Sequence, residues 1–458
     1  MDEGSSKDDL KKLGLKELVA IGIGGMIGGG IFSTLGLLLQ YAGVAAPFAF
    51  SIGAVIALLS AYSYAKFSYY HPCIGGTIEY IAMVIDNLFA LDYINALLWV
   101  GYIVMVSLYA YAFGSYAAAL LGFHEGTFWY FVIQHIMITL VLIAFTAINA
   151  LGSHVMSKVE DLLVYVKVGI LLFFVMIGLM RSDPTLLFSK TWPPINMVLL
   201  GGLIMFSAYE GFGIISNASL EAKRREDVYR AFFISVIIVA IIYVSIAYVA
   251  VTTLNPKLVA KYKDYALGVV AEPIIGKVGF VIIAIAALLS TASAINATIF
   301  GAARIAHFLP KMEKVVGENV KAMELLKYEV LLSGLISLVL ANVFDLSNIA
   351  VMGSLAFLLI YAMVNYAATK MADVIWAKRT ITVTALVLNI VAAIVLAWTS
   401  LSVDFYGQSL SLITLLVPPL IIALIMRPLR KYLFYKHFVE YFADFFRKPR
   451  EAEQVCCA

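Results

Sequence analysis

Long apolar runs separated by short polar segments dominate the sequence. No charged residue occurs from Leu18 to Ala65, which is enough for two membrane crossings, because one spanning helix needs roughly 20 mostly apolar residues. A break near Ala42, Gly43 and Pro47 divides this stretch. The pattern therefore predicts twelve transmembrane helices in an all-α integral membrane protein. The ten further runs are 93–123, 127–149, 158–180, 196–218, 231–253, 278–303, 328–344, 347–369, 380–400 and 407–426.

The composition excludes a soluble enzyme of two or three domains. Hydrophobic residues make up 62% of the 458 residues and charged residues only 13%, whereas a soluble domain is about 45–50% apolar and about 25% charged. The net charge of +3 is explained by charged loops, so no nucleic-acid partner is implied. Cys73 is isolated, and Cys456 and Cys457 are adjacent, so we expect no disulfide framework.

The distribution of Lys and Arg predicts the orientation of the chain. With a cytoplasmic N-terminus and alternating spans, 25 Lys and Arg residues fall on the cytoplasmic side and 6 on the other. Positively charged loops are retained in the cytoplasm, so both termini are expected inside, in the plasma membrane of the cell. Residues 1–12 are too highly charged for a signal peptide, and the apolar run after them is too long.

Six glycines crowd the first span. Residues 21–32 read IGIGGMIGGGIF, and each glycine inside a helix costs about 1 kcal/mol relative to alanine. One interpretation is tight helix packing, because Gly24 and Gly28 have the GxxxG spacing, as do Gly25 and Gly29. The other is local unwinding in mid-membrane, which is tolerated where the backbone faces protein or a water-filled cavity. The three consecutive glycines favour unwinding.

The sixth span carries a matching feature. Residues 205–213 read MFSAYEGFG, and this glycine-interrupted segment lies five spans after the first. Paired interruptions of this kind indicate a transporter with inverted repeats. We therefore expect a first repeat in 18–180, an inverted repeat in 181–370, two added helices in 371–426, and cytoplasmic tails at 1–17 and 427–458.

Interrupted helices 1 and 6 would expose unpaired backbone groups in the membrane. Free N–H groups begin the second half of a broken helix and free C=O groups end its first half. The helix dipole adds partial positive charge to the former and partial negative charge to the latter. Such ends can bind the carboxylate and the ammonium of a zwitterion. The sequence therefore predicts a site for an amino acid.

Two charged residues lie within apolar spans. Lys167 is about nine residues into helix 5, close to mid-membrane at about 1.5 Å per residue. Its side chain either reaches towards the inner interface or titrates and carries a proton. Glu210 lies in the interruption of helix 6. It is a hydrogen-bonded structural acid, a partner for a cationic group or a second proton site, and the sequence alone leaves these alternatives open.

Several stretches carry a resemblance to a known family. They are GIGGMIGGGIFS in helix 1, PCIGGTIEY after helix 2, SAYEGFGIISNASLEA in helix 6, ALGVVAEPIIG before helix 8 and ASAINATIFGAARIA within it. The chain resembles the amino acid–polyamine–organocation superfamily, and within it the archaeal and bacterial proton-coupled amino acid transporters of broad specificity. The resemblance implies a five-plus-five inverted repeat of the leucine-transporter type.

The resemblance also implies roles for particular residues at the two interruptions. The substrate carboxylate would meet the N–H groups of Gly28, Gly29 and Gly30, and Phe206 or Tyr209 would act as a gate. The substrate amine would meet carbonyl groups of four residues. These are Ile27, Ser207, Ala208 and Glu210.

Lys167 matches a lysine that replaces sodium in the proton-coupled relatives. Its implied neighbours are the Gly24 carbonyl and the hydroxyls of Ser290 and Ser293. These hydroxyls line a cavity or bond back to their own helix. Glu210 departs from the family, because close relatives have an apolar residue at its position, and it could favour cationic amino acids or amines.

These observations predict a secondary transporter that moves amino acids by proton-coupled symport and alternating access. The alternative is an exchanger or importer of cationic amino acids or polyamines on the same fold. An intramembrane enzyme would need a nucleophile–base pair or clustered metal ligands in the spans, and the sequence has neither. We expect no cofactor and no metal ion. The expected partners are an amino acid or amine, protons and the lipid bilayer.

Overall fold

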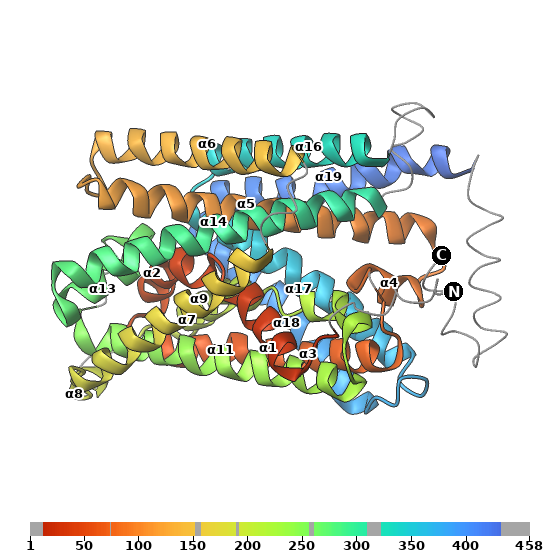
Figure 1. Ribbon diagram of the computed structural model, residues 1–458, viewed down its shortest axis with the longest axis horizontal. Coiled ribbons are helices and arrows are strands. Elements are labelled where there is room, and N and C mark those ends of the chain that lie inside the picture. Colours follow the sequence, from red (N-terminus) through yellow and green to blue (C-terminus); the bar gives the residue numbers. More distant parts are fainter. Residues whose placement is uncertain are drawn as a thin grey trace, which may run out of the picture.

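The structure is a computed structural model that describes residues 12–73, 75–151, 157–188, 192–255, 261–308 and 322–431. Its helices run roughly along one axis (Figure 1). In these ranges ten helices are long and apolar enough to cross a membrane, and Val164–Met180 is a shorter apolar helix. The predicted all-helical, multi-pass membrane architecture is confirmed. Most of the predicted N-terminal tail, and the C-terminal tail beyond residue 431, lie outside the described residues.

The uninterrupted long helices follow the predicted apolar runs closely. Their ends differ from the predicted ends by a few residues, because polar flanking residues extend several helices beyond the apolar run. The bounds are α3 (Ala46–Tyr70), α5 (Leu88–Leu120), α6 (Phe128–Ala150), α7 (Ser157–Met180), α11 (Arg225–Thr253), α14 (Lys277–Phe308), α16 (Ala322–Val343), α17 (Leu346–Lys370), α18 (Arg379–Val403) and α19 (Phe405–Lys431).

Two of the predicted spans are interrupted. The first consists of α1 (Leu15–Met26) and α2 (Gly30–Ala42), with a non-helical step between them. The later one consists of α9 (Ile195–Ile204), the 3₁₀ turn η3 (Met205–Tyr209) and α10 (Ile214–Asn217). Both interruptions fall at the glycine-containing segments. Between α2 and α3 the chain turns through η1 (Gly43–Ala45), where the break was expected.

The interrupted helices lie in the interior of the helix bundle. In α5 and α17, 89% of the apolar 18-residue segment is buried inside the protein. The buried share of this segment is 22% in α6 and α19 and 33% in α18. α6 and α19 therefore lie at the periphery, where large apolar side chains such as Phe131 and Ile413 are exposed. Such side chains suit contact with lipid tails. α5 and α17 are central supports, and both pack against the interrupted helices.

The two ends of the bundle carry short elements. One end, here called the α4 end, holds α4 (Thr77–Ala82); the opposite end, the α13 end, holds α8 (Thr185–Phe188) and α13 (Ala266–Ile275) (Figure 1). The turn η5 (Lys263–Tyr265) precedes α13. The apolar run of α13 is too short to cross a membrane, so the span pattern does not predict it. η5 packs against α2, because the Gly36 position lies directly against the Lys263 backbone.

Candidate substrate and ion site

The two interruptions meet inside the bundle. A methyl group added at Gly30 would lie 2.7 Å from Ala208 Cα, and one added at Gly25 would lie 2.6 Å from Gly211 O. Gly211 itself has φ +114°, a conformation that side chains disfavour. The backbones therefore approach as closely as glycine allows. The packing interpretation of the glycine run fits Gly25, and the unwinding interpretation fits Gly28 and Gly29, which are non-helical.

The first interruption presents three consecutive backbone N–H donors. Among the described residues, no acceptor is found for the N–H groups of Gly28, Gly29 and Gly30, although all three residues are buried. An unpaired buried N–H group carries the free-energy cost of a lost hydrogen bond. The N–H groups of Gly28, Gly29 and Gly30 also lie at the start of α2, where the helix dipole favours an anion. An anionic group such as a carboxylate would satisfy the three N–H groups.

Carbonyl groups of the same interruption are already held by hydroxyl groups. Ser290 Oγ donates to Gly28 O at 2.6 Å and to Ile27 O at 3.3 Å. Tyr243 on α11 donates its hydroxyl to Met26 O at 2.8 Å. Ser293 is buried on α14 near Ser290. These hydroxyl groups hold the unwound backbone in place through its carbonyl groups and do not bond to its N–H groups.

The second interruption is held by α17. Ser354 Oγ accepts from Ser207 N at 3.0 Å and donates to Ile204 O at 2.7 Å. Glu210 follows in an extended conformation (φ −61°, ψ 146°). Ser207 O accepts from Glu210 N at 3.3 Å, a weak bond. Ser354 was not among the predicted site residues, since a lone serine in an apolar helix gives no signal.

Phe206 and Tyr209, the two predicted gate residues, face different neighbours. Tyr209 donates its hydroxyl to Phe50 O on α3 at 3.3 Å, and its ring packs against Tyr243. The Phe206 ring lies against Tyr361 of α17, with ring centroids 5.7 Å apart. Tyr209 is therefore anchored to α3, whereas the movement of Phe206 is limited by ring packing alone. Of the two, Phe206 is the better gate candidate.

Glu210 is buried beside tyrosine side chains. Its exposed fraction is 7%, and no hydrogen bond to its carboxyl group is found in the described part of the chain. Tyr102, Tyr109 and Tyr361 lie within electrostatic range of this carboxyl group. An unpaired buried carboxylate is costly unless a cation or a proton neutralises it. The structural-acid interpretation, which needs a hydrogen-bonded carboxyl group, finds no support in these contacts.

Lys167 is directed towards the first interruption. Its Nζ donates to Gly24 O at 3.2 Å, and only 4% of the residue is exposed. Gly24 also allows close packing of α1 on α7, because an added methyl group would lie 2.7 Å from a Val164 methyl carbon. The ammonium group therefore points into the protein rather than towards an interface. It lies one helical turn of α1 from the unpaired N–H groups of Gly28 and Gly29.

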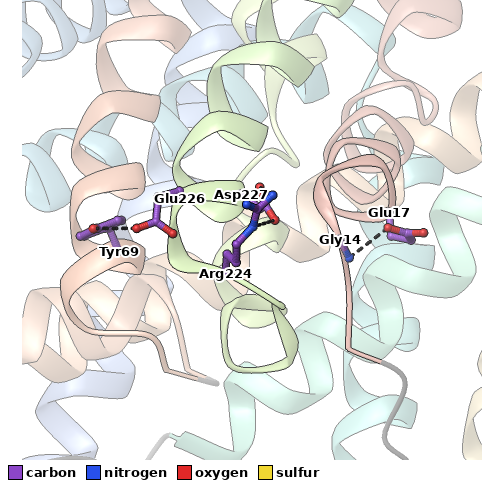
Figure 2. Close-up of polar contacts among 6 residues, drawn as sticks. All are labelled: Gly14, Glu17, Tyr69, Arg224, Glu226 and Asp227. Atoms are coloured by element: carbon purple, nitrogen blue, oxygen red, sulfur yellow. Dashed lines mark hydrogen bonds and ion pairs between the residues drawn. The ribbon is translucent and has the colours of Figure 1, made fainter.

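The α4 end is closed by backbone pairing. Leu13 N donates to Glu221 O at 2.7 Å, and Lys223 N donates to Leu13 O at 2.8 Å, so the start of α1 pairs with the segment after α10. Figure 2 shows the polar contacts around this pairing. There Tyr69 donates to Glu226 at 3.2 Å and Arg224 pairs with Asp227 at 3.3 Å.

We expect Leu13→Pro to loosen the α4 end, because proline has no N–H group to donate to Glu221 O. A hydrogen bond contributes about 1 kcal/mol to stability, so its loss should make the opened form of the α4 end about five-fold more populated. Maleimide labelling of buried Cys73 should become faster by the same factor. The measurement uses protein with Cys456 and Cys457 replaced by serine. Leu13→Ala keeps the N–H group and should label at the parental rate. Equal rates for both variants would contradict the role of this pairing.

Two carboxyl groups lie together at the α13 end. Asp264 N donates to Glu125 Oε2 at 3.3 Å, and Gln134 Nε2 lies 3.4 Å from Asp264 Oδ2. Burial, and then the charge of Asp264, raise the pKa of Glu125 to about 8. Burial also raises the pKa of Asp264, while Lys263 opposes this shift. The pair therefore holds η5 on the α5–α6 connection most firmly when it carries a proton.

This pair makes stability depend on pH. Because the pKa of Glu125 is raised on folding, the native state binds more protons than the unfolded state between about pH 4.5 and 8. Stability falls with rising pH wherever the native state binds more protons. We expect the melting temperature to fall from about pH 5 to 8 and Glu125→Gln to flatten this dependence. Glu272→Gln, an exposed control, should keep it; an unchanged slope in Glu125→Gln would contradict the assignment.

The arrangement of the two interruptions defines a class of protein. Two interrupted helices meet in the interior of a multi-pass bundle, with buried backbone N–H groups and a buried ammonium group nearby, and this is the architecture of a membrane transporter. Residues 13–424 match the family model described as amino acid permease. The chain belongs to the amino acid permease family. It is a transporter rather than an enzyme, as predicted, and its assignment to the wider superfamily is confirmed.

The chain is also similar to individual proteins, two of which are named as transporters. The chain is 31% identical over 415 residues to the uncharacterized protein MJ0609 of Methanocaldococcus jannaschii, covering 89% of this chain and 94% of that protein. It is 32% identical over 296 residues to the inner membrane transport protein YbaT of Escherichia coli, covering 63% of this chain and 67% of that protein. It is 25% identical over 226 residues to the chloroplastic cationic amino acid transporter 7 of Arabidopsis thaliana, covering 45% and 38%.

Proposed function

We propose that the protein is a secondary active transporter that moves amino acids across the cytoplasmic membrane by proton-coupled symport. The proposal is carried by the buried N–H groups of Gly28, Gly29 and Gly30, for which the described residues provide no acceptor. A substrate carboxylate satisfies these donors, and the substrate ammonium takes the carbonyl groups at Ile27, Ser207, Ala208 and Glu210. Desolvated backbone groups bind a zwitterion without a fixed counter-charge.

The proposed architecture has twelve spans. α2 and α3 form one continuous apolar stretch, Gly30–Tyr70, which counts as two spans divided at η1. Repeats over 18–180 and 181–370, followed by α18 and α19, would relate the two interrupted helices by an inverted symmetry. The excess of Lys and Arg at the α4 end supports an orientation with both termini in the cytoplasm and the α13 end outside. Alternating access would then open the two ends in turn.

Proton coupling rests on Lys167. The charged ammonium holds Gly24 O, and charge-assisted hydrogen bonds are about twice as strong as neutral ones. Loss of the proton weakens this bond and frees the end of α1 beside the substrate site. The proton therefore links the position of α1 to the occupancy of the carboxylate site. Ser290 and Ser293 on α14 complete the proposed coupling site.

The test is uptake into proteoliposomes. Purified protein is reconstituted, and labelled neutral amino acids are added with an inward proton gradient. We expect accumulation that a protonophore collapses, and no accumulation with sodium alone. Exchange of internal for external amino acid that ignores the proton gradient would overturn the coupling while leaving transport intact.

A second candidate function is transport of cationic amino acids or amines. It is favoured by the Glu210 carboxyl group, which is buried, lies beside several tyrosines and has no hydrogen-bond partner in the described residues. A substrate cation would neutralise it, with aromatic faces adding cation–π attraction. The name of the Arabidopsis relative points to the same substrate class.

On this second candidate, Glu210→Gln should abolish counterflow of labelled arginine. A hydrogen bond to a charged group is worth about 1.5–3 kcal/mol, which is a loss of roughly 10-fold to 150-fold in arginine affinity. Neutral amino acid uptake should persist in the variant. The exposed Glu272→Gln is the matched control. If arginine does not compete with neutral substrates in the parent protein, the candidate is wrong.

A further inference from the structure

Lys66, near the end of α3, lies among three tyrosine rings at the α4 end. Its Nζ is 5.9 Å from the ring centroid of Tyr62, 5.8 Å from that of Tyr70 and 5.5 Å from that of Tyr229. Tyr229 belongs to α11, and Figure 2 shows the same two helix ends joined through a tyrosine and a glutamate. A cation within about 6 Å of a ring centroid is attracted by the ring face. The rings therefore hold the ammonium group in place but leave its charge uncompensated.

A second ammonium group lies beside the first. Lys378 N donates to the Tyr62 hydroxyl at 2.8 Å, which holds the connection between α17 and α18 against α3. The charge of Lys378 acts on Lys66, so the two ammonium groups lie within electrostatic range. Across the described ranges, neither lysine has a carboxylate at ion-pair distance. Two like charges repel each other, so an anion placed between them would be stabilised.

This pair of lysines is accessible at the rim of the bundle. Lys66 is partly buried and Lys378 is exposed. The α17–α18 connection also carries two exposed apolar side chains, Val374 at 55% and Trp376 at 75%. α18 follows directly and lies at the periphery, next to lipid. Tryptophan is enriched where a membrane protein crosses the membrane–water interface, so the connection lies where lipid headgroups reach the protein.

Trp376 has a backbone conformation that bulky residues rarely adopt. Its φ is +47°, and in the described part of the chain it is the one residue other than glycine with a positive φ. This conformation costs roughly 1–2 kcal/mol and persists only where the surrounding structure holds it. Ala377 N donates to Ala372 O at 2.8 Å and closes the turn around Trp376. An exposed ring on a strained turn is unfavourable in water, and contact with the lipid interface would offset this cost.

These features favour an anion that is attached to an apolar body. Lysine ammonium groups bind phosphate as point charges, and tyrosine hydroxyls can donate further hydrogen bonds. A free phosphate ion would leave the exposed Val374 and Trp376 unused, whereas a phospholipid brings acyl chains to them. A headgroup with its own cation, such as choline, would be repelled by the two lysines. The ligand that fits is an anionic phospholipid.

We propose that Lys66 and Lys378 bind the phosphate group of an anionic phospholipid in the leaflet at the α4 end. The phosphate lies between the two ammonium groups, and Trp376 contacts the headgroup region. The lipid thereby joins α3, α11 and the α17–α18 connection. In the proposed orientation this leaflet is cytoplasmic, where anionic lipids attract basic residues. The site goes beyond the proposed function, because it requires lipid binding and no transport.

The test is native mass spectrometry of the full-length protein in an uncharged detergent, which removes the general attraction of a charged membrane surface. Three probes are titrated: phosphatidylglycerol, phosphatidylcholine with the same acyl chains, and inorganic phosphate. Two lysines at about five-fold each predict that phosphatidylglycerol binds roughly 25-fold more tightly than phosphatidylcholine. Equal affinities of the two lipids would overturn the site. Competition by inorganic phosphate at the concentration of the lipid would assign the site to a free anion and overturn the lipid.

Charge variants test the two lysines. Lys66→Gln and Lys378→Gln should each weaken phosphatidylglycerol binding about five-fold, whereas Lys66→Arg keeps the charge and should bind as the parent. Lys370→Gln is the matched control, because Lys370 is an exposed lysine 5.7 Å from the ring centroid of Tyr366 on the neighbouring α17. It should bind as the parent. Equal losses in the control and in Lys66→Gln would overturn the site. Should Lys66→Gln fail to fold, the exposed Lys378→Gln decides.

A third variant tests the lipid contact of Trp376. Glycine adopts a positive φ without strain, so Trp376→Gly should be at least as stable as the parent in lipid-free detergent. Its affinity for phosphatidylglycerol should nevertheless fall, because the ring no longer contacts the lipid. Unchanged affinity in this variant would overturn the assignment to a lipid.

The failure of this site and the failure of the proposed function are distinguishable, because lipid binding is measured without an amino acid. Protein that transports amino acids but binds both lipids equally refutes the lipid site alone. Selective binding of phosphatidylglycerol by protein that transports no amino acid refutes the proposed function alone.

Discussion

Replacing Lys167 with alanine is expected to abolish pH-driven accumulation of substrate in proteoliposomes. The variant loses the ammonium group that holds Gly24 O at 3.2 Å and has no titrating group in its place. One proton crossing 100 mV supplies about 2.3 kcal/mol, and about 1.36 kcal/mol corresponds to ten-fold. If one proton is coupled to each substrate molecule, as proposed, the parent protein would sustain a gradient of roughly fifty-fold. In Lys167→Ala the substrate concentration inside the proteoliposomes should not exceed the concentration outside.

Two further variants separate coupling from a structural role of Lys167. Lys167→Arg keeps a positive charge at Gly24 O but does not release its proton. It should bind substrate and yet fail to accumulate it on a pH gradient. Lys277→Ala removes an exposed lysine and should behave as the parent. Accumulation by Lys167→Ala at the parental level would refute the coupling role, whatever the effect on the rate.

Gly30→Ala should have the largest effect on substrate affinity. The added methyl group would lie 2.7 Å from the Ala208 backbone, so the two interruptions must move apart. Overpacking costs about 1–3 kcal/mol, and about 1.4 kcal/mol corresponds to ten-fold in affinity. We therefore expect a loss of roughly 5-fold to 150-fold at the central site, measured by binding of a neutral amino acid to the detergent-solubilised protein.

Gly169→Ala is the matched control for this substitution. Gly169 lies on α7, and nothing is within 4 Å of an added methyl group. Alanine is also the better helix former, so this variant should keep the parental affinity and be slightly more stable. Equal affinities in the two glycine variants would show that the close approach of the interruptions is not needed for binding.

The interruptions of the two spans were predictable because glycine and charge are rare in transmembrane helices. Three consecutive glycines, and Glu210 between Tyr209 and Gly211, each violate the local pattern of an apolar helix. Lys167 was detectable for the same reason. Violations of a local rule mark functional positions, and here they led to the residues that the structure brings together. The roles assigned to these residues remain predictions that the experiments above test.

The supporting residues could not be predicted, because each is ordinary in its own segment. Tyr109, Tyr361 and Tyr243 are each one of several aromatic residues in their apolar helices, and Ser354 is a serine in a small-residue stretch. Their importance arises only when helices far apart in sequence pack together. Tyr243 lies more than 200 residues from Met26, whose carbonyl it holds. Tertiary proximity of this kind leaves no periodic signal in one sequence.

The α13 end illustrates the same limit. The predicted span pattern treats residues 254–277 as a polar connection, but η5 and α13 form within it and pack on α2. Their apolar residues are too few for a span and are buried on other elements instead.

Substrate binding at the two interruptions can be tested by a cryo-electron microscopy structure of the protein in a nanodisc with a transported amino acid bound. We expect continuous density for the ligand between α2 and η3, with its carboxylate within hydrogen-bond distance of the N–H groups of Gly28, Gly29 and Gly30. A ligand bound elsewhere while these groups stay unpaired, or two unbroken helices at 21–32 and 205–213, would contradict it.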